Sequence, residues 1–181
     1  LRPGVARLYP HELSGGMKQR VAMAIGISLR PNLIIADEPT SALDVVVQRQ
    51  IMQTLGRLQE GLDASIMLVG HDMGLVAQFA DTIGVMYAGQ LVEVGPVDEV
   101  FSDPKHPYTK LLIRSLPSLQ EKREFLGIPG SPPQLIHLPK GCAFAERCPS
   151  RFEKCDEAIP AYLNLGNRRS TACHLYEGEG Q

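Results

Sequence analysis

The stretch LIIADEPTSALD, residues 33–44, decides the fold class, because it reads as a buried strand that ends in two carboxylates. Leu33 to Ala36 form a short apolar run, as expected for a strand that is covered on both faces. Asp37 and Glu38 follow at its carboxyl end, which is where α/β sheets place their ligands. The rest of the stretch is polar and turn-like. It therefore predicts an α/β domain with a charged site at the end of a strand.

The segments on either side of this stretch alternate between helical and strand patterns. We predict a helix that Ser14 N-caps and Pro31 stops, a strand over 32–37, a helix over 45–62, a strand over 65–70, a helix over 73–79 and a hairpin that turns at Ala88 and Gly89. The apolar stripes of the two long helices comprise Met17, Val21, Ala24, Ile25 and Ser28 in the first, and Val47, Ile51, Leu55 and Leu58 in the second. This order indicates a partly parallel sheet with an antiparallel edge.

The pattern of predicted elements changes after Gly95. A short acidic helix and an amphipathic helix follow, and the inward positions of the amphipathic helix are Tyr108, Leu111, Leu112 and Leu116. Residues 127–141 are rich in Pro and Gly and read as an extended linker. We therefore divide the chain into residues 1–95, a helical connection over 96–126 and a cysteine-bearing extension over 127–181.

Asp37 and Glu38 suit phosphoryl transfer. An Asp at such a strand end helps to hold Mg²⁺ in phosphate-transferring enzymes, directly or through water. A neighbouring Glu can orient or deprotonate the attacking water. The alternative is a strand that merely ends in solvated carboxylates.

Other motifs accompany this pair in a fixed order. LSGGMKQR (13–20) precedes the strand, SALD (41–44) follows it, and LVGHD (68–72) lies one helix further on. With these motifs the chain closely resembles the nucleotide-binding domain of ABC transporters. The resemblance makes LSGGMKQR the signature motif, LIIADEP the Walker B strand, SALD the D-loop and His71 the switch histidine.

The resemblance assigns a role to each of these residues. Ser14, Gly15 and Gly16 would contact phosphate at a helix N-terminus, where backbone N–H groups and the helix dipole favour an anion. His71 would donate a hydrogen bond to the γ-phosphate, and Asp44 would communicate across the dimer. The alternatives are an ordinary N-cap at Ser14 and at Asp44, and a buried histidine that caps a turn.

Two expected parts are missing, a phosphate-binding loop and a glutamine-bearing loop, both of which precede the signature motif in the family. The sequence has no G-x-x-x-x-G-K-[ST] loop, which in the family precedes the signature motif and binds the β- and γ-phosphates. The resemblance therefore implies the C-terminal part of an ABC-type P-loop NTPase domain, a mostly parallel sheet with flanking helices, plus a small cysteine-bearing C-terminal extension. Its cofactors would be ATP and Mg²⁺. We expect the chain alone to have little or no ATPase activity.

The segments GQLVEVGPVDEVFSDPKHPYTKLLIRSLP (89–117) and GCAFAERCP (141–149) resemble the ABC importers of dipeptides and oligopeptides, and sometimes of nickel. This resemblance implies an ATPase subunit that couples energy to transport. It implies three kinds of partner: a second ATP-binding subunit in a homo- or heterodimer, transmembrane permease subunits and, indirectly, a peptide-binding protein. The subunit would be peripheral, on the cytoplasmic face of the cell membrane.

Four cysteines lie in the last quarter of the chain: Cys142, Cys148, Cys155 and Cys173. No secretory signal opens the sequence, which favours a metal over disulfides. Close C-x₂-C pairs typical of structural zinc are missing, and standard ferredoxin spacings do not match. The subfamily resemblance points to a [4Fe–4S] cluster, which we place before zinc, with disulfides or unligated thiols last. Nearby basic residues either offset the charge of a cluster or form a solvated face: Arg147, Arg151, Lys154, Arg168 and Arg169.

Two other classes of function compete with the importer subunit. An ABC-type ATPase of DNA repair or chromosome maintenance shares the signature and Walker B motifs. However, the net charge of −2 gives no electrostatic reason to expect nucleic acid. A non-enzymatic module that binds metal or an iron–sulfur cluster is the second alternative.

Overall fold

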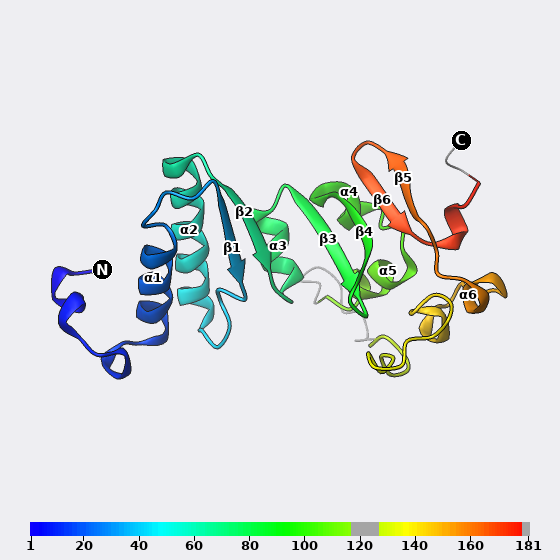
Figure 1. The fold of residues 1–181 in the computed structure, drawn as a ribbon, viewed down its shortest axis with the longest axis horizontal. Coiled ribbons are helices and arrows are strands. Elements are labelled where there is room, and N and C mark those ends of the chain that lie inside the picture. The colour runs from blue at the N-terminus through cyan, green and yellow to red at the C-terminus, as the bar shows by residue number, and fades with distance from the viewer. Residues whose placement is uncertain (117–126, 179–181) are drawn as a thin grey trace. The chain divides into compact units, whose positions relative to one another are not determined.

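The computed structural model describes residues 1–116 and 127–178 (Figure 1). The chain folds into two compact units, Leu1–Phe79 and Ala80–Gln181. Its helices are α1 (Gly15–Gly26), α2 (Val45–Leu62), α3 (Met73–Phe79), α4 (Val97–Ser102), α5 (Pro107–Arg114) and α6 (Lys154–Glu157), and its strands are β1 (Leu33–Asp37), β2 (Ser65–Val69), β3 (Thr82–Tyr87), β4 (Gln90–Pro96), β5 (Tyr162–Gly166) and β6 (Arg169–Ala172). None of the helices in the described ranges has the length and apolar character that crossing a bilayer requires.

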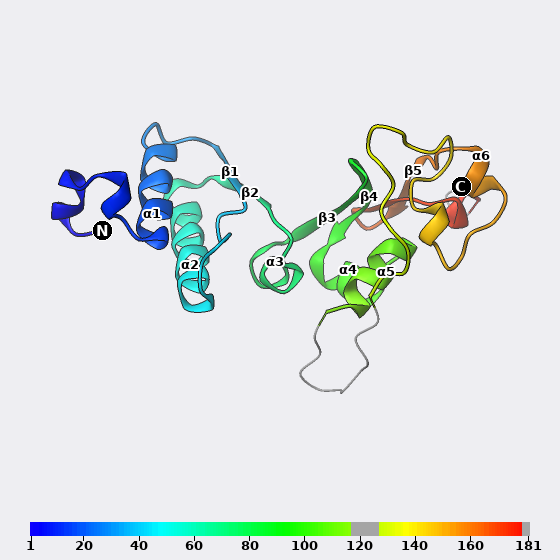
Figure 2. The same cartoon turned by 90° about the horizontal axis from the view of Figure 1, so that it is seen from below.

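The first unit is built on a parallel pair of strands. In β1 and β2, Leu33 lies opposite Ser65 and Asp37 lies opposite Val69. Helices α1 and α2 run side by side next to this pair (Figures 1 and 2). The helices and strands predicted for this part of the chain are confirmed, although α1 ends at Gly26, before Pro31.

The core of the first unit lies between the strands and α2. Ile51, Met52 and Leu55 of α2 are buried, which confirms Ile51 and Leu55 as part of the predicted stripe. The stripe predicted for α1 is wrong at Ala24, Ile25 and Ser28, which are exposed, whereas Met17 and Val21 are half-buried. Met23, which we did not place on the stripe, packs against the core. The N-terminal glycines of α1 lie against Leu43 and against Val47 at the start of α2.

The face of the β1–β2 pair that points away from α2 is not covered by the described residues. Because side chains alternate along a strand, Ala36 and Leu68 point into the core and their neighbours point away. The outward residues are apolar and exposed: Leu33 (53%), Ile35 (63%), Met67 (55%) and Val69 (44%). Parallel strands are normally covered on both faces. The apolar side chains on this face are therefore of the kind that other parts of a protein normally cover.

The second unit contains an antiparallel sheet of four strands in the order β3-β4-β6-β5. The β3–β4 hairpin turns at Ala88 (φ 48°) and Gly89 (φ 79°), as predicted. Strand β6 pairs with β4, so that Thr171 lies opposite Glu93. The α/β class is confirmed, but the mostly parallel sheet is wrong for the described residues. The reason is that the C-terminal hairpin, for which we predicted no strands, extends the β3–β4 hairpin.

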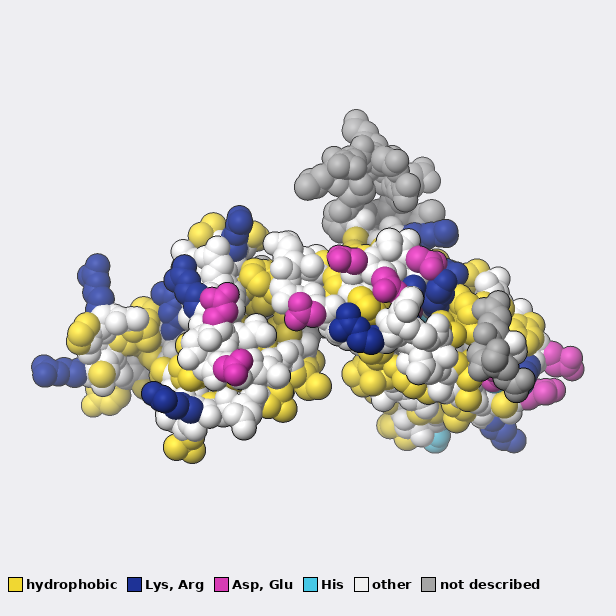
Figure 3. Space-filling model, turned by 90° about the horizontal axis from the view of Figure 1, so that it is seen from above, with side chains coloured by type: hydrophobic (Ala, Val, Ile, Leu, Met, Phe, Trp, Pro, Cys, Tyr) yellow, Lys and Arg dark blue, Asp and Glu magenta, His cyan; other side chains and the backbone are white. Residues whose placement is uncertain are grey.

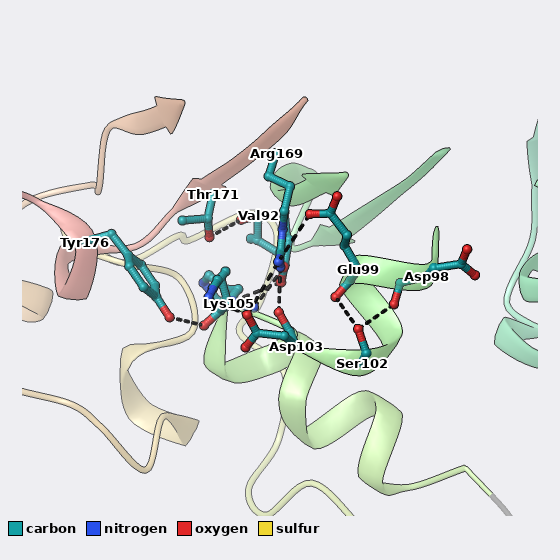
Figure 4. Close-up of polar contacts among 11 residues, drawn as sticks. Val92, Asp98, Glu99, Ser102, Asp103, Lys105, Arg169, Thr171 and Tyr176 are labelled. Carbon is teal, nitrogen blue, oxygen red and sulfur yellow. Dashed lines mark hydrogen bonds and ion pairs between the residues drawn. The ribbon is translucent and has the colours of Figure 1, made fainter. Parts of the chain in front are cut away.

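A buried ion pair between Arg169 and Glu93 fastens this C-terminal hairpin to the rest of the second unit. Figure 4 shows Arg169 of β6 directed toward Asp103. Nη2 of Arg169 donates to Oε1 of Glu93 at 3.1 Å and to the carbonyl oxygen of Asp103 at 2.6 Å. The exposed fractions of the two side chains are only 9% for Arg169 and 1% for Glu93. The Glu93 carboxylate also accepts the N–H groups of Lys105 and His106, at 2.8 and 2.9 Å. One carboxylate thus holds both β6 and the start of α5.

Helix α5 packs against the cysteine segment through aromatic rings. The ring centroids of Tyr87, Tyr108 and Phe144 lie 4.7 to 5.3 Å apart. Thr109 is fully buried, whereas the predicted inward residues Tyr108, Leu111, Leu112 and Leu116 are only half-buried. The ring of Tyr108 faces those of Tyr87 and Phe144, so the contacts of this helix include aromatic packing that its apolar spacing did not indicate.

Candidate active site

Glu38 and His71 meet at the carboxyl ends of the two parallel strands. Glu38 directly follows β1, and its backbone N–H donates to the carbonyl oxygen of Val69, the last residue of β2, at 2.8 Å. His71 comes two residues after β2. Its Nδ1 lies 3.1 Å from Oε1 of Glu38. The parallel pairing therefore brings together two side chains that are 33 residues apart.

Both side chains reach solvent. The exposed fraction is 49% for the Glu38 side chain and 80% for that of His71. The alternative of a buried histidine that caps a turn is therefore wrong. When Nδ1 carries a proton it donates to Glu38, and Nε2 is then left to face another group. The pair thus offers one basic oxygen and one imidazole nitrogen to a molecule that binds here.

A cavity of about 180 Å³ lies beside the pair. Its polar lining includes Glu38, Thr40, Ser41, Gln48, His71 and Asp72. Gln48, from the first turns of α2, donates through Nε2 to the carbonyl oxygen of Thr40 at 3.2 Å. We did not single out Gln48 from the sequence, because a glutamine near the start of a helix carries no motif.

The signature residues lie at the N-terminus of α1. Oγ of Ser14 accepts the N–H of Met17 at 3.4 Å, so the N-cap alternative is confirmed. A Cβ on Gly15 would stand 2.9 Å from Leu43, and a Cβ on Gly16 would stand 2.7 Å from Val47. A Cβ at either position would crowd these side chains, so the two glycines let α1 lie close to Leu43 and to Val47 of α2, whether or not phosphate binds.

Asp44 and Asp37 occupy the ends of their elements. Oδ1 of Asp44 accepts the N–H of Val47 at 2.9 Å, which confirms that it N-caps α2. Asp37 is exposed at the last position of β1. Neither residue lines the cavity, and neither do Ser14, Gly15 and Gly16. The roles that the sequence suggested for these five residues in binding ATP and Mg²⁺ stay predictions.

The four cysteines of the second unit converge on one small pocket. Cys142, Cys148, Cys155 and Cys173 all line it, and all four are free thiols. The N–H of Cys142 donates to the carbonyl oxygen of Cys155 at 2.8 Å. Gly141 allows this approach, because a Cβ there would stand 2.2 Å from that oxygen. The fold therefore gathers thiols that are spread over the C-terminal segment.

These thiols do not form a finished metal site. Burial raises the pKa of Cys142 and Cys148, and it raises the pKa of Cys173 to about 11, because an apolar surrounding disfavours the thiolate. Across residues 1–116 and 127–178, no group of three or more His, Cys, Asp or Glu side chains is arranged to hold a metal ion. The shared pocket fits the donor set of the predicted cluster, but the side-chain arrangement gives the cluster no support.

Most of the basic residues near the cysteines have other partners. We expected them either to offset the charge of a cluster or to form a solvated face. The contacts are Arg147 with the carbonyl groups of Ile128 and Pro129 and the hydroxyl of Tyr87, Arg151 with Asp156, Lys154 with Glu177, and Arg169 with Glu93. These contacts hold the segment together, so these four side chains are not directed at the thiols.

Comparisons with known proteins agree with these motifs. Residues 2–41 match the ABC transporter family, and residues 92–155 match a family described as "Oligopeptide/dipeptide transporter, C-terminal region". The chain is 46% identical to the oligopeptide transport ATP-binding protein AppD of Bacillus subtilis, over 97% of this chain and 54% of that protein. It is 44% identical to the dipeptide transport ATP-binding protein DppD of Bacillus subtilis, over 93% of this chain and 51% of that protein.

Two further matches complete the comparison. The oligopeptide transport ATP-binding protein OppD of Salmonella typhimurium is 50% identical over 85% of this chain and 46% of that protein. The solved structure of cbiO1 from Clostridium perfringens is 36% identical over 51% of this chain and 37% of that chain, and its TM-score of 0.49 is too low to support a statement about the fold. The chain spans about half the length of the curated relatives that it matches.

Proposed function

The chain belongs to the ABC transporter family, in the branch of the oligopeptide and dipeptide transport ATP-binding proteins, and from this membership we propose that it is part of the energy-coupling ATPase subunit of a peptide importer. The subunit hydrolyses ATP at a dimer interface to drive transport. The observation that carries the proposal is the approach of Glu38 and His71, 3.1 Å apart at the ends of two parallel strands and beside a cavity.

This pair can serve phosphoryl transfer by positioning. Little covalent chemistry falls to the protein in such reactions, so placing the water and stabilising charge matter most. The Glu38 carboxylate orients the attacking water and takes its proton. In its imidazolium form His71 donates through Nδ1 to Glu38 and through Nε2 to the γ-phosphate. Asp37, an exposed carboxylate at the strand end, would hold the Mg²⁺ that neutralises charge on the phosphates.

The signature motif serves a second nucleotide. We assign Ser14 and the N–H groups of Gly15 and Gly16 to an ATP that another ATP-binding subunit holds, because the start of a helix favours an anion. Asp44 caps helix α2, and we assign it to communication across the dimer. The site is then shared between two subunits, which makes dimerisation a condition for turnover.

The bare face of the β1–β2 pair supports the idea that the active protein is longer. The four exposed apolar side chains on this face need a cover, and the relatives are about twice as long as this chain. We propose that additional polypeptide both covers this face and supplies the Walker A loop. We call the chain joined to such a Walker A half the full-length version.

Phosphate release from ATP tests the proposed function. We expect turnover by the full-length version and none by the chain alone, because the residues that cradle the β- and γ-phosphates are missing from this sequence. The two proteins are compared at equal concentration with Mg²⁺ present. Absence of turnover in the full-length version would refute the proposal.

The partners follow from the same proposal. They are a second ATP-binding subunit, transmembrane permease subunits and, indirectly, a peptide-binding protein, and they place the subunit on the cytoplasmic face of the membrane. Nucleic acid is not among them. Figure 3 shows Lys and Arg side chains together with Asp and Glu side chains on one face of both units, so a single-sign patch does not mark that face. This mixture supports the importer over an ATPase of DNA repair.

A [4Fe–4S] cluster in the cysteine pocket is the second part of the proposal. The four free thiols that line the pocket support it, and Cys155 and Cys173 are buried there. The four sulfur atoms would have to come together to hold it. When bound, the cluster would supply folding free energy to a segment with little apolar core. The thiolates would hold it, and at Cys142, Cys148 and Cys173 the cluster would have to overcome the burial that raises the pKa of each thiol.

Anaerobic purification decides between a cluster, zinc and free thiols. We expect iron and sulfide in the purified chain, a broad visible absorption band, and loss of both the metal and thermal stability in the Cys155→Ser variant. Ser115→Ala, a change away from the pocket, serves as the control. Zinc in place of iron would count against the cluster. So would an iron-free chain whose melting temperature the Cys155→Ser change does not alter.

A further inference from the structure

Gln48 connects the loop that follows Glu38 to helix α2. Its Nε2 donates to the carbonyl oxygen of Thr40 at 3.2 Å, in a half-buried contact. We propose that Gln48 is a positioning residue, which holds this loop so that Glu38 keeps its orientation toward bound nucleotide. The inference rests on the proposed ATPase function, and it adds a residue that the motifs of the family do not mark.

The loop needs such an anchor because its backbone is strained. Glu38 (φ 42°) and Ala42 (φ 58°) are both in the left-handed region, which residues other than glycine seldom adopt. Strained conformations persist only where the surrounding structure holds them, and they are common at functional sites. Here the strained positions begin with the carboxylate that we assign to water activation.

Hydrogen bonds anchor the loop at each end. The N–H of Glu38 donates to Val69 at 2.8 Å, the N–H of Ser41 donates back to Glu38 at 3.0 Å, and the N–H of Leu43 donates to Thr40 at 3.3 Å. The Thr40 carbonyl therefore accepts two donors, one from the backbone and one from Gln48. A carbonyl only accepts, so the amide nitrogen of Gln48 must face it.

Gln48 acts on the site through the loop. It lines the same cavity as Glu38 and His71, yet its hydrogen bond goes to Thr40 and not to either of them. Replacing Gln48 would leave both Glu38 and His71 in place but would release the Thr40 carbonyl, and with it the loop that follows Glu38. A small displacement of a catalytic group is costly in rate, because the reaction depends on alignment.

Hydrogen exchange in the chain itself tests the anchor. Gln48→Met keeps the length of the side chain, removes the donor and suits a helix. We expect exchange at the amides of Ser41 and Leu43 to speed up about five- to tenfold, as the loss of one hydrogen bond predicts. Gln48→Lys, which restores a donor, should recover part of the protection. Gln53→Met, an exposed position of the same helix, is the matched control and should leave exchange at Ser41 and Leu43 unchanged.

Steady-state kinetics of the full-length version supply the second readout. We expect Gln48→Met to lower kcat about ten- to a hundredfold and to change KM for ATP far less, because alignment is lost and nucleotide binding is not. Unchanged exchange at Ser41 and Leu43 overturns the inference, as does an unchanged kcat in a protein that turns over ATP. If the unaltered full-length version does not hydrolyse ATP, the proposed function fails, and the exchange result alone decides whether Gln48 holds the loop.

Discussion

Glu38→Gln in the full-length version is expected to leave ATP binding intact and to lower turnover by about 10²- to 10⁴-fold, the range for loss of a general base. The amide has the shape of the carboxylate and can still face His71, which lies 3.1 Å away. It cannot take a proton from water. Nucleotide binding and phosphate release, measured on the same preparation, separate the two effects.

Glu60→Gln is the control for this change. Glu60 lies on α2 and is exposed, so it should leave turnover at the level of the unaltered protein. Hydrolysis at that same level by the Glu38 variant would remove Glu38 from the catalytic role. A loss of ATP binding would instead show that the carboxylate holds the nucleotide or its Mg²⁺.

Arg169→Ala is expected to destabilise the second unit by about 3–5 kcal/mol, the range for breaking one partner out of a buried ion pair. The Glu93 carboxylate, 1% exposed, would keep the N–H groups of Lys105 and His106 but lose the cation that pairs with it among the described residues. The carbonyl of Asp103 would lose a donor as well. Urea unfolding followed by circular dichroism measures the change.

Arg151→Ala provides the comparison for Arg169→Ala. Arg151 pairs with Asp156 at 3.0 Å, but both side chains are largely exposed. Solvent screens such a pair, so its removal should change stability little. If the two Arg variants unfold at the same urea concentration, the buried pair does not hold the C-terminal hairpin in place.

The sequence predicted the parts of the fold that local patterns encode. Helices α1 and α2, the two parallel strands and the β3–β4 hairpin follow from periodicity, caps and one turn, all of which lie within a few residues of each other. The approach of Glu38 and His71 follows from the same patterns, because the carboxyl ends of neighbouring parallel strands meet at one edge.

The features that the sequence did not predict depend on contacts between distant segments. Arg169 and Glu93 are 76 residues apart, and neither carries a local sign that it will be buried. The same holds for the pairing of β6 with β4. We expected the C-terminal segment to be a separate extension, but its hairpin belongs to the same sheet as β3 and β4. Ile25, on the predicted apolar stripe of α1, is 70% exposed, and apolar periodicity within the helix does not indicate this.

The central claim is that this chain holds the catalytic carboxylate of an ATPase but depends on a Walker A half for the nucleotide. Phosphate release measured side by side on the chain alone, the full-length version and the full-length Glu38→Gln variant tests it most directly. We expect turnover in the unaltered full-length version only. ATP hydrolysis by the chain alone, or none by the full-length version, would contradict it.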